Sequence, residues 1–289
     1  MSGLLWSVPP IARNTFREAV RQPVFWIIVF VTIGLMWLTA NIPLWTIAGA
    51  GENERMAKDI GLATVTLCGL LVAVFASSSV ISDELEKKTA LTVLSKPVTR
   101  GQFVLGKYIG IALVVLLACA IVGAILIVFT SWYVIGPREG EYVDHPDANV
   151  RHELIQRIRR DRIVAAHTIA QGTVLSYLQV MLLASVSVAI STRAPMVVNV
   201  TSCVVLFIVG RMADWMRSLI PGDGAVLKKV WAVAYSILPN LDNTYAQMTL
   251  AQGRTVSWEY MGWVTLHAGI YAVGALLLAT YLLRRREIA

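Results

Sequence analysis

A glycine-lysine pair at the start of one apolar run has almost the spacing of a phosphate-binding loop. Residues 101–108 read GQFVLGKY and match the Gly-x-x-x-x-Gly-Lys-Ser/Thr pattern except at the last position. That position needs serine or threonine to hold magnesium, and here it is Tyr108. The loop should also follow a buried strand, whereas this segment leads into an apolar run. We therefore predict no nucleotide binding by this chain. Gly106 instead indicates close helix packing, and Lys107 indicates an anchor at the lipid headgroups.

Other chemically active side chains do not form a complete catalytic or metal-binding set. His152 and Glu153 begin a His-Glu-x-x-His zinc pattern, but Gln156 replaces the second histidine. A weak metal site in a polar loop is conceivable, although a solvated loop is the reading that we favour for Asp144, His145 and Asp147. No Ser-His-Asp set or carboxylate pair falls within an apolar run. The sequence thus predicts no enzymatic activity, no metal and no cofactor.

The composition is that of a membrane protein. Of 289 residues, 56% are hydrophobic and 15% are charged, against about 45–50% and about 25% in a soluble domain. The formal net charge is +7, and a basic excess in a membrane protein usually lies near lipid headgroups. No nucleic-acid-binding signature is present. We expect membrane lipid, and no nucleic acid, among the partners. The cysteines lie in apolar runs, as packing residues would: Cys68, Cys119 and Cys203.

Six apolar runs are candidates for transmembrane helices, which need about 20 residues each. They cover residues 24–47, 60–81, 104–135, 169–190, 194–210 and 262–283. The predicted fold class is therefore an all-α membrane protein of six transmembrane helices, with residues 1–289 forming a single transmembrane domain. The run 104–135 is too short for two crossings and a turn, so it counts as one span.

The predicted spans contain very few ionisable residues, which argues against a proton-coupled carrier or an ion channel. They do contain polar residues that could line a path through the membrane. Hydrogen bonding between helices is the reading that we favour for these residues, which are Gln179, Ser185, Ser187, Ser191 and Asn199.

An even number of spans places both termini on one side of the membrane. Lysine and arginine favour the cytoplasmic side, and they precede the first span, follow the last span and occur within residues 82–107. We therefore expect both termini and residues 82–103 in the cytoplasm, and residues 136–168 and 213–258 outside. Residues 151–162, RHELIQRIRRDR, are an exception, because this topology places their basic side chains outside.

An amphipathic helix is predicted over residues 11–22, before the first span. One face carries Ala12, Phe16, Ala19 and Val20. On another face, arginines recur every four residues, at Arg13, Arg17 and Arg21. Such a helix lies in the membrane interface. The alternative is an ordinary basic flank of the first span.

The polar segment between the second and third runs predicts a short helix on the membrane surface. Ser82 or Asp83 can cap this helix, acidic residues occupy its first turn, and Pro97 ends it. A helix of this kind can rest on the bilayer, or it can dock into a groove of a soluble partner.

The order of residues in this segment is specific. It reads Glu84-x-Glu86-x-x-Thr89, then Leu94-Ser95-Lys96-Pro97-Val98-Thr99-Arg100, and then Gly106-Lys107. In this order it resembles the signature of the type-2 permease family of ATP-binding-cassette (ABC) transporters. Lys88 stands where many members have glycine, and this change favours continuation of the helix. A second family-like element is Leu238-Pro239-Asn240-Leu241-Asp242.

The resemblance implies the membrane-spanning permease subunit of an ABC exporter in the cell membrane. In this family the loop between spans two and three forms a coupling helix that docks on a separate ATPase subunit. The coupling residues would be Glu84, Glu86, Thr89, Leu94, Pro97 and Arg100. A second permease copy, identical or related, would complete the complex. The scarcity of charge in the spans favours an amphipathic or lipid-like cargo. The alternatives are a membrane anchor or assembly factor that docks an ATPase without transport, and an intramembrane enzyme.

Overall fold

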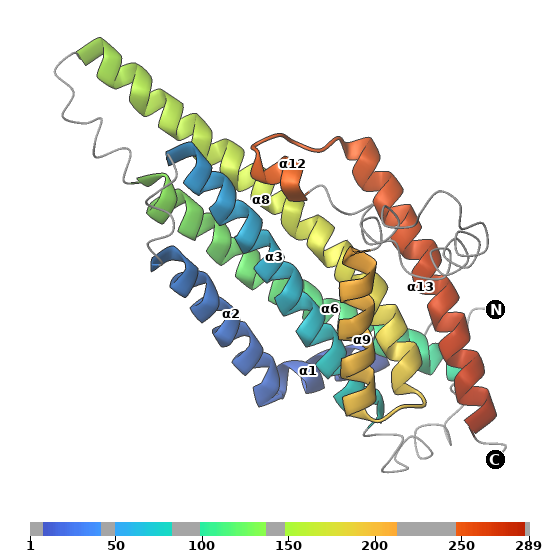
Figure 1. Cartoon of the computed structure of the whole chain (residues 1–289). Helices are drawn as coiled ribbons and strands as arrows, with labels where there is room; N and C mark the ends of the chain where they lie inside the picture. Colours follow the sequence, from blue (N-terminus) through green and yellow to red (C-terminus); the bar gives the residue numbers. More distant parts are fainter. Residues whose placement is uncertain (1–7, 42–49, 83–98, 137–147, 213–246, 287–289) are drawn as a thin grey trace, which may run out of the picture.

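All the regular elements in the described part of the chain in this computed structural model are helices (Figure 1). It comprises residues 8–41, 50–82, 99–136, 148–212 and 247–286. The elements are α1 (Val8–Arg21), α2 (Pro23–Asn41), α3 (Ala50–Ser77), the π-helix η2 (Ser78–Ser82), α6 (Arg100–Phe129), the π-helix η3 (Thr130–Val134), α8 (Ala148–Ser191), α9 (Met196–Arg211), α12 (Gln247–Ala251) and α13 (Trp258–Arg286).

Four described helices are long and apolar enough to cross a membrane, and α1 with α2 gives a fifth candidate if this bent pair is one span. The four candidates are Glu54–Ile81, Arg100–Val134, Asn149–Ser191 and Trp258–Arg284. The described residues thus support four or five spans where the sequence predicts six. The predicted run 194–210 corresponds to α9, whose 16 residues extend about 24 Å, less than the roughly 30 Å of a hydrocarbon core.

Helices α3, α6 and α8 pack together as the centre of the bundle. In the most apolar part of the span formed by α3 and η2, 67% of the residues are buried, and the same share is buried in the most apolar part of α8. In the most apolar part of α13 only 22% are buried, so this helix is peripheral. Glycines allow the central helices to approach closely. A Cβ added at Gly172 of α8 would lie 2.6 Å from Leu62 of α3, and one added at Gly123 of α6 would lie 2.7 Å from Thr173 of α8.

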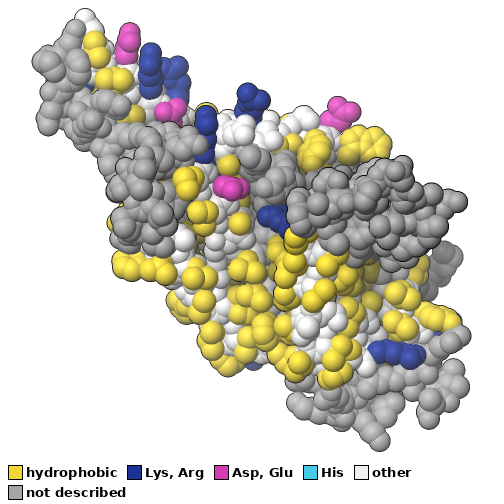
Figure 2. All heavy atoms as spheres, in the orientation of Figure 1, with side chains coloured by type: hydrophobic (Ala, Val, Ile, Leu, Met, Phe, Trp, Pro, Cys, Tyr) yellow, Lys and Arg dark blue, Asp and Glu magenta, His cyan; other side chains and the backbone are white. Residues whose placement is uncertain are grey.

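The outer surface is apolar along the helices and charged toward their ends. Figure 2 shows hydrophobic side chains over much of the visible lower face, whereas charged side chains gather mainly at the upper end. Large exposed apolar residues occupy α2 and α13, including Trp26, Phe30, Trp37, Trp263 and Ile270. Such a surface is unfavourable in water and suits the lipid hydrocarbon. The helices therefore indicate an integral membrane protein.

Helix α8 is longer than the sequence analysis predicts. The predicted span 169–190 is only its C-terminal part, and residues 148–168, predicted as part of a polar loop, are helical. Its 44 residues extend about 66 Å, roughly twice the hydrocarbon thickness. The helix continues because residues 148–171 contain no glycine or proline and many good helix formers. Its N-terminal part projects beyond the other helices in Figure 1.

Candidate functional site

The candidate site is the end of the bundle from which residues 83–98 depart. These residues lie outside the described part of the chain, so five predicted coupling residues remain predictions: Glu84, Glu86, Thr89, Leu94 and Pro97. The attachment points on either side are described. Helix η2 precedes the segment and α6 follows it. Helix α1 and the turn between α8 and α9 lie at the same end of the bundle (Figure 1).

A capping box defines the start of α6. The Thr99 hydroxyl accepts a hydrogen bond from the Gln102 backbone N–H at 3.4 Å, and Gln102 Oε1 accepts one from the Thr99 N–H at 2.9 Å. These bonds satisfy two donors at the helix N-terminus. The Thr-x-x-Gln pattern is visible in the sequence, although the sequence analysis did not use it. The predicted coupling residue Arg100 is the first residue of α6 and is half-buried.

Helix α1 packs on α6 through two glycines one turn apart. A Cβ added at Gly106 would lie 2.8 Å from Ile11, and one added at Gly110 would lie 2.5 Å from Thr15 and 2.8 Å from the Ala12 carbonyl oxygen. The close contact predicted for Gly106 is therefore present, and its partner is α1.

The opposite face of α1 is basic and exposed. Arg13, Arg17 and Arg21 are exposed, whereas Ala12 and Ala19 are buried and Phe16 is half-buried. Helix α1 also makes an angle of 60° with α2, so the two helices do not form one straight span.

The substitution Gly110→Ala is expected to lower the free energy of unfolding by about 1–3 kcal/mol, as overpacking does. The Ala12 carbonyl is backbone and cannot rotate away, so α1 must shift. The matched control is Gly101→Ala on the same helix, where an added Cβ meets nothing within 4 Å. Thermal unfolding in lipid nanodiscs would compare the two proteins. Equal stability would contradict the tight α1–α6 contact.

Lys107 does not extend to the lipid headgroups, so that prediction was wrong. Its side chain is only 2% exposed. The Nζ atom donates to the Val80 carbonyl oxygen of η2 at 3.4 Å and lies 5.5 Å from the centre of the Phe103 ring. A cation is favourable there because carbonyl groups at a helix C-terminus carry partial negative charge. Residues 101–108 are helical within α6, which is not the geometry of a phosphate-binding loop.

A buried polar cluster connects α9 to α3 and α8. Asn199 Nδ2 of α9 lies 2.8 Å from Ser78 Oγ and 3.0 Å from Ser187 Oγ. The hydroxyls of Ser77 and Ser187 also share a hydrogen bond. For Ser187 and Asn199 the structure thus shows the interhelical hydrogen bonds that the sequence analysis favoured. Ser185 instead bonds within α8, to the Leu182 carbonyl oxygen at 2.6 Å.

The corner between α1 and α2 is also bonded to η2. The Ser79 hydroxyl donates to Gln22 Oε1 at 2.9 Å. Gln22 lies between the two helices, directly before Pro23. Helix η2, which continues α3, is therefore hydrogen-bonded to the corner between α1 and α2.

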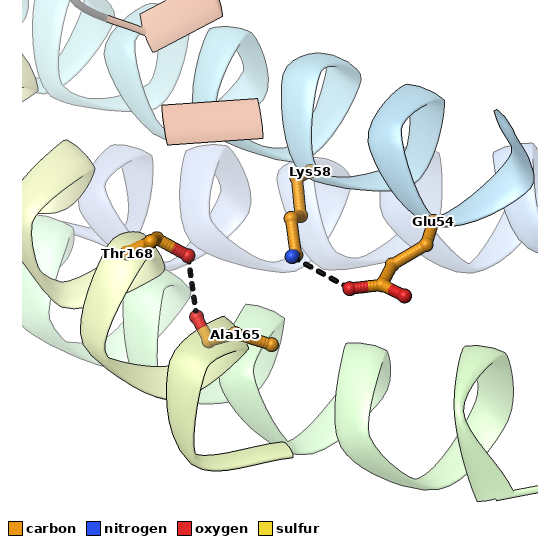
Figure 3. A network of polar contacts seen from close by, with 4 residues as sticks. All are labelled: Glu54, Lys58, Ala165 and Thr168. Atoms are coloured by element: carbon orange, nitrogen blue, oxygen red, sulfur yellow. Dashed lines mark hydrogen bonds and ion pairs between the residues drawn. The ribbon is translucent and has the colours of Figure 1, made fainter. Parts of the chain in front are cut away.

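A buried ion pair lies nearer the other end of α3. Lys58 is 3% exposed, and its Nζ is 2.7 Å from Glu54 Oε1 (Figure 3). In the figure the pair faces the turn of α8 that contains Ala165 and Thr168. The sequence analysis missed this pair because its predicted span begins at residue 60. The spacing of four residues between opposite charges was the available signal.

No group of three or more His, Cys, Asp or Glu residues that could hold a metal ion occurs within the described ranges. The conceivable ligands Asp144, His145 and Asp147 lie outside those ranges. His152 and Glu153 are exposed on α8.

The long apolar helices thus define an integral membrane protein. A family model described as ABC-2 family transporter protein matches residues 10–144, which include α1 to α6 and the predicted coupling segment. This match supports membership of the ABC-2 type permease family, as the loop motif predicted. The family is a membrane component of transporters, is not itself catalytic and generally pairs with an ABC ATPase subunit. No curated protein matches the chain significantly.

Proposed function

We propose that this chain is the membrane-spanning permease subunit of an ABC exporter, driven by ATP that a separate subunit hydrolyses. The observation that carries the proposal is the family match over residues 10–144, which spans the segment carrying the coupling signature. Closure of an ATPase pair on ATP would push the coupling helices and switch the spans between two packings. Two permease copies, identical or related, would sit on the two ATPase subunits.

The proposed topology has six spans, formed by α2, α3 with η2, α6 with η3, α8, α9 and α13. Helix α9 is short, but Asn199 bonds it into the bundle, which supports its inclusion. Helix α1 would lie in the cytoplasmic interface of the cell membrane, with its arginines toward anionic headgroups. These arginines are Arg13, Arg17 and Arg21. Phe16 would face the lipid and the rest of the bundle.

The cargo that we propose is amphipathic or lipid-like. The buried cations Lys58 and Lys107 lie toward the two ends of the bundle, at the start of α3 and the start of α6. The buried polar groups between these ends include hydroxyls such as those of Thr66 and Ser176. Transport of a small ion usually involves charged side chains within the spans, so this distribution favours a cargo without a concentrated charge.

Single cysteines at Ser95 and at Val150 are expected to react with a membrane-impermeant maleimide from opposite sides. The Val150 position should label in intact cells, because the topology places the start of α8 outside. The Ser95 position should label only after permeabilisation. Background should be low, since Cys68, Cys119 and Cys203 are buried. Labelling of both positions in intact cells would contradict the six-span topology.

The proposed function is tested by purification and reconstitution. A tagged chain should co-purify an ATPase subunit, and the complex should hydrolyse ATP and move a fluorescent phospholipid across proteoliposomes. The chain purified alone should not bind Mg-ATP, because Tyr108 replaces the required serine or threonine and Lys107 is buried. Tight Mg-ATP binding by the chain alone would contradict the proposal. An ATPase complex that moves no amphipathic cargo would favour the anchor or assembly function.

A further inference from the structure

Four consecutive residues at the end of α3 are bonded to four different parts of the bundle. We call Ser77–Val80 the exit node, because η2 ends at Ser82, directly before residues 83–98. Ser77 bonds Ser187 of α8, Ser78 bonds Asn199 of α9, Ser79 bonds Gln22 at the α1–α2 corner, and the Val80 carbonyl accepts from Lys107 of α6. The node is therefore hydrogen-bonded to α8, α9, the α1–α2 corner and α6.

The backbone at the node is a π-helix, η2 (Ser78–Ser82). A π-turn inserts one residue into the helical register and is found mostly as a single turn, frequently at functional sites. The changed register lets successive side chains reach neighbours in different directions. Ser77, Ser78, Val80 and Asn199 are fully buried. Because a buried polar group is costly without a hydrogen-bond partner, these bonds are not easily exchanged for water.

We propose that the exit node passes displacement of the coupling segment to the surrounding helices, with Asn199 and Lys107 as positioning residues. This inference rests on the proposed function. Helix η2 ends at Ser82, directly before residues 83–98, and α6 begins at Arg100 after them, so a push on that segment acts directly on η2 at one end and on α6 at the other. The node bonds oblige α9, α6 and α8 to move with η2 or to break buried hydrogen bonds, and the α1–α2 corner to move with it or to break a part-buried one. Such contacts favour two discrete packings over continuous deformation.

The variants that test the node are Asn199→Leu and Lys107→Met, which remove bonding groups at similar volume. Lys107→Arg keeps the cation and should restore function. The matched control is Thr66→Val, which removes the 2.9 Å bond between Thr66 and Ser176. That bond also joins α3 to α8, but it lies about three turns before the node. This control therefore shows whether losing any hydrogen bond between α3 and α8 has the same effect as losing a bond of the node.

Spin labels at Ile27 of α2 and Val197 of α9 would report the motion, since these side chains are 59% and 76% exposed. The full complex with its co-purified ATPase subunit is measured in nanodiscs, without nucleotide and after trapping with ATP and vanadate. In the otherwise unmodified protein and in Thr66→Val, we expect the distance between the labels to change on trapping. In Asn199→Leu and Lys107→Met we expect the trapped population to fall about fivefold or more, although the ATPase subunit stays bound.

Normal trapping in both node variants would overturn the inference while the proposed function stands. Failure of the unmodified chain to bring down any ATPase would overturn the proposed function and the inference with it. If a node variant is not recovered, Ser79→Ala removes the bond to Gln22 at a part-buried site, together with a longer bond of 3.3 Å to the Ala76 carbonyl oxygen of the same helix. The same loss of trapping is expected from it, and unchanged trapping would count against the node.

Discussion

Reversing Glu84 and Glu86 to lysine is expected to release the ATPase subunit while the helices remain folded. The two glutamates belong to the family signature between η2 and α6, and they fall in the first turn of the predicted coupling helix. Neither lies in an apolar run, so insertion into the membrane should not change. If the helix docks in a groove, loss of a desolvated charge partner typically costs about 2–5 kcal/mol. That range corresponds to binding weaker by about 30-fold to several thousand-fold.

The measurement is co-purification of the ATPase subunit at equal expression, with ATP hydrolysis by the complex. A suitable control reverses two exposed acids on the projecting part of α8, as Glu153→Lys with Asp161→Lys. That variant should retain the partner. A small loss that disappears at high salt would place the glutamates at the rim of the interface. Normal binding and hydrolysis in Glu84→Lys/Glu86→Lys would show that the segment rests passively on the bilayer.

Replacing Glu54 with glutamine is expected to lower the free energy of unfolding by about 3–5 kcal/mol, the usual effect of removing one partner of a buried ion pair. The substitution leaves the Lys58 ammonium buried without its carboxylate. The Glu54 side chain is 16% exposed, compared with 4% for Lys58, so we expect the lower end of that range. The measurement is thermal unfolding in nanodiscs, followed by tryptophan fluorescence.

Two further variants separate the ion pair from general effects on α3. Glu54→Gln combined with Lys58→Met should recover most of the stability, because it removes the buried charge that Glu54→Gln alone leaves without a partner. Asp59→Asn makes the same acid-to-amide change at an exposed position of the same helix. It should alter stability by no more than about 0.5 kcal/mol. A large effect of Asp59→Asn, or no recovery in the double variant, would contradict the role given to the pair.

Residue order alone indicated a membrane protein and a resemblance to the ABC-2 type permease family. Long apolar runs without charge are a local property, and they specify helices in lipid because a spanning backbone must satisfy its own hydrogen bonds. The periodicity of Arg13, Arg17 and Arg21 likewise placed the basic face of α1 correctly. The resemblance of the loop signature to that family could be seen in the sequence because it depends on residue order alone. The extension of α8 to Ala148 could also have been predicted from the sequence, since residues 148–171 contain no glycine or proline.

Only the tertiary structure decided which residues meet. Lys107 looked like a headgroup anchor, and its burial depends on the end of α3 lying beside the start of α6. The partner of Gly106 and Gly110 could have been any helix, and packing made it α1. Asn199 is separated from Ser78 by more than a hundred residues, yet the two are hydrogen-bonded. Helix packing in lipid depends on shape and on pairing of the few buried polar groups. These pairings join distant segments, so no local pattern in the sequence specifies them.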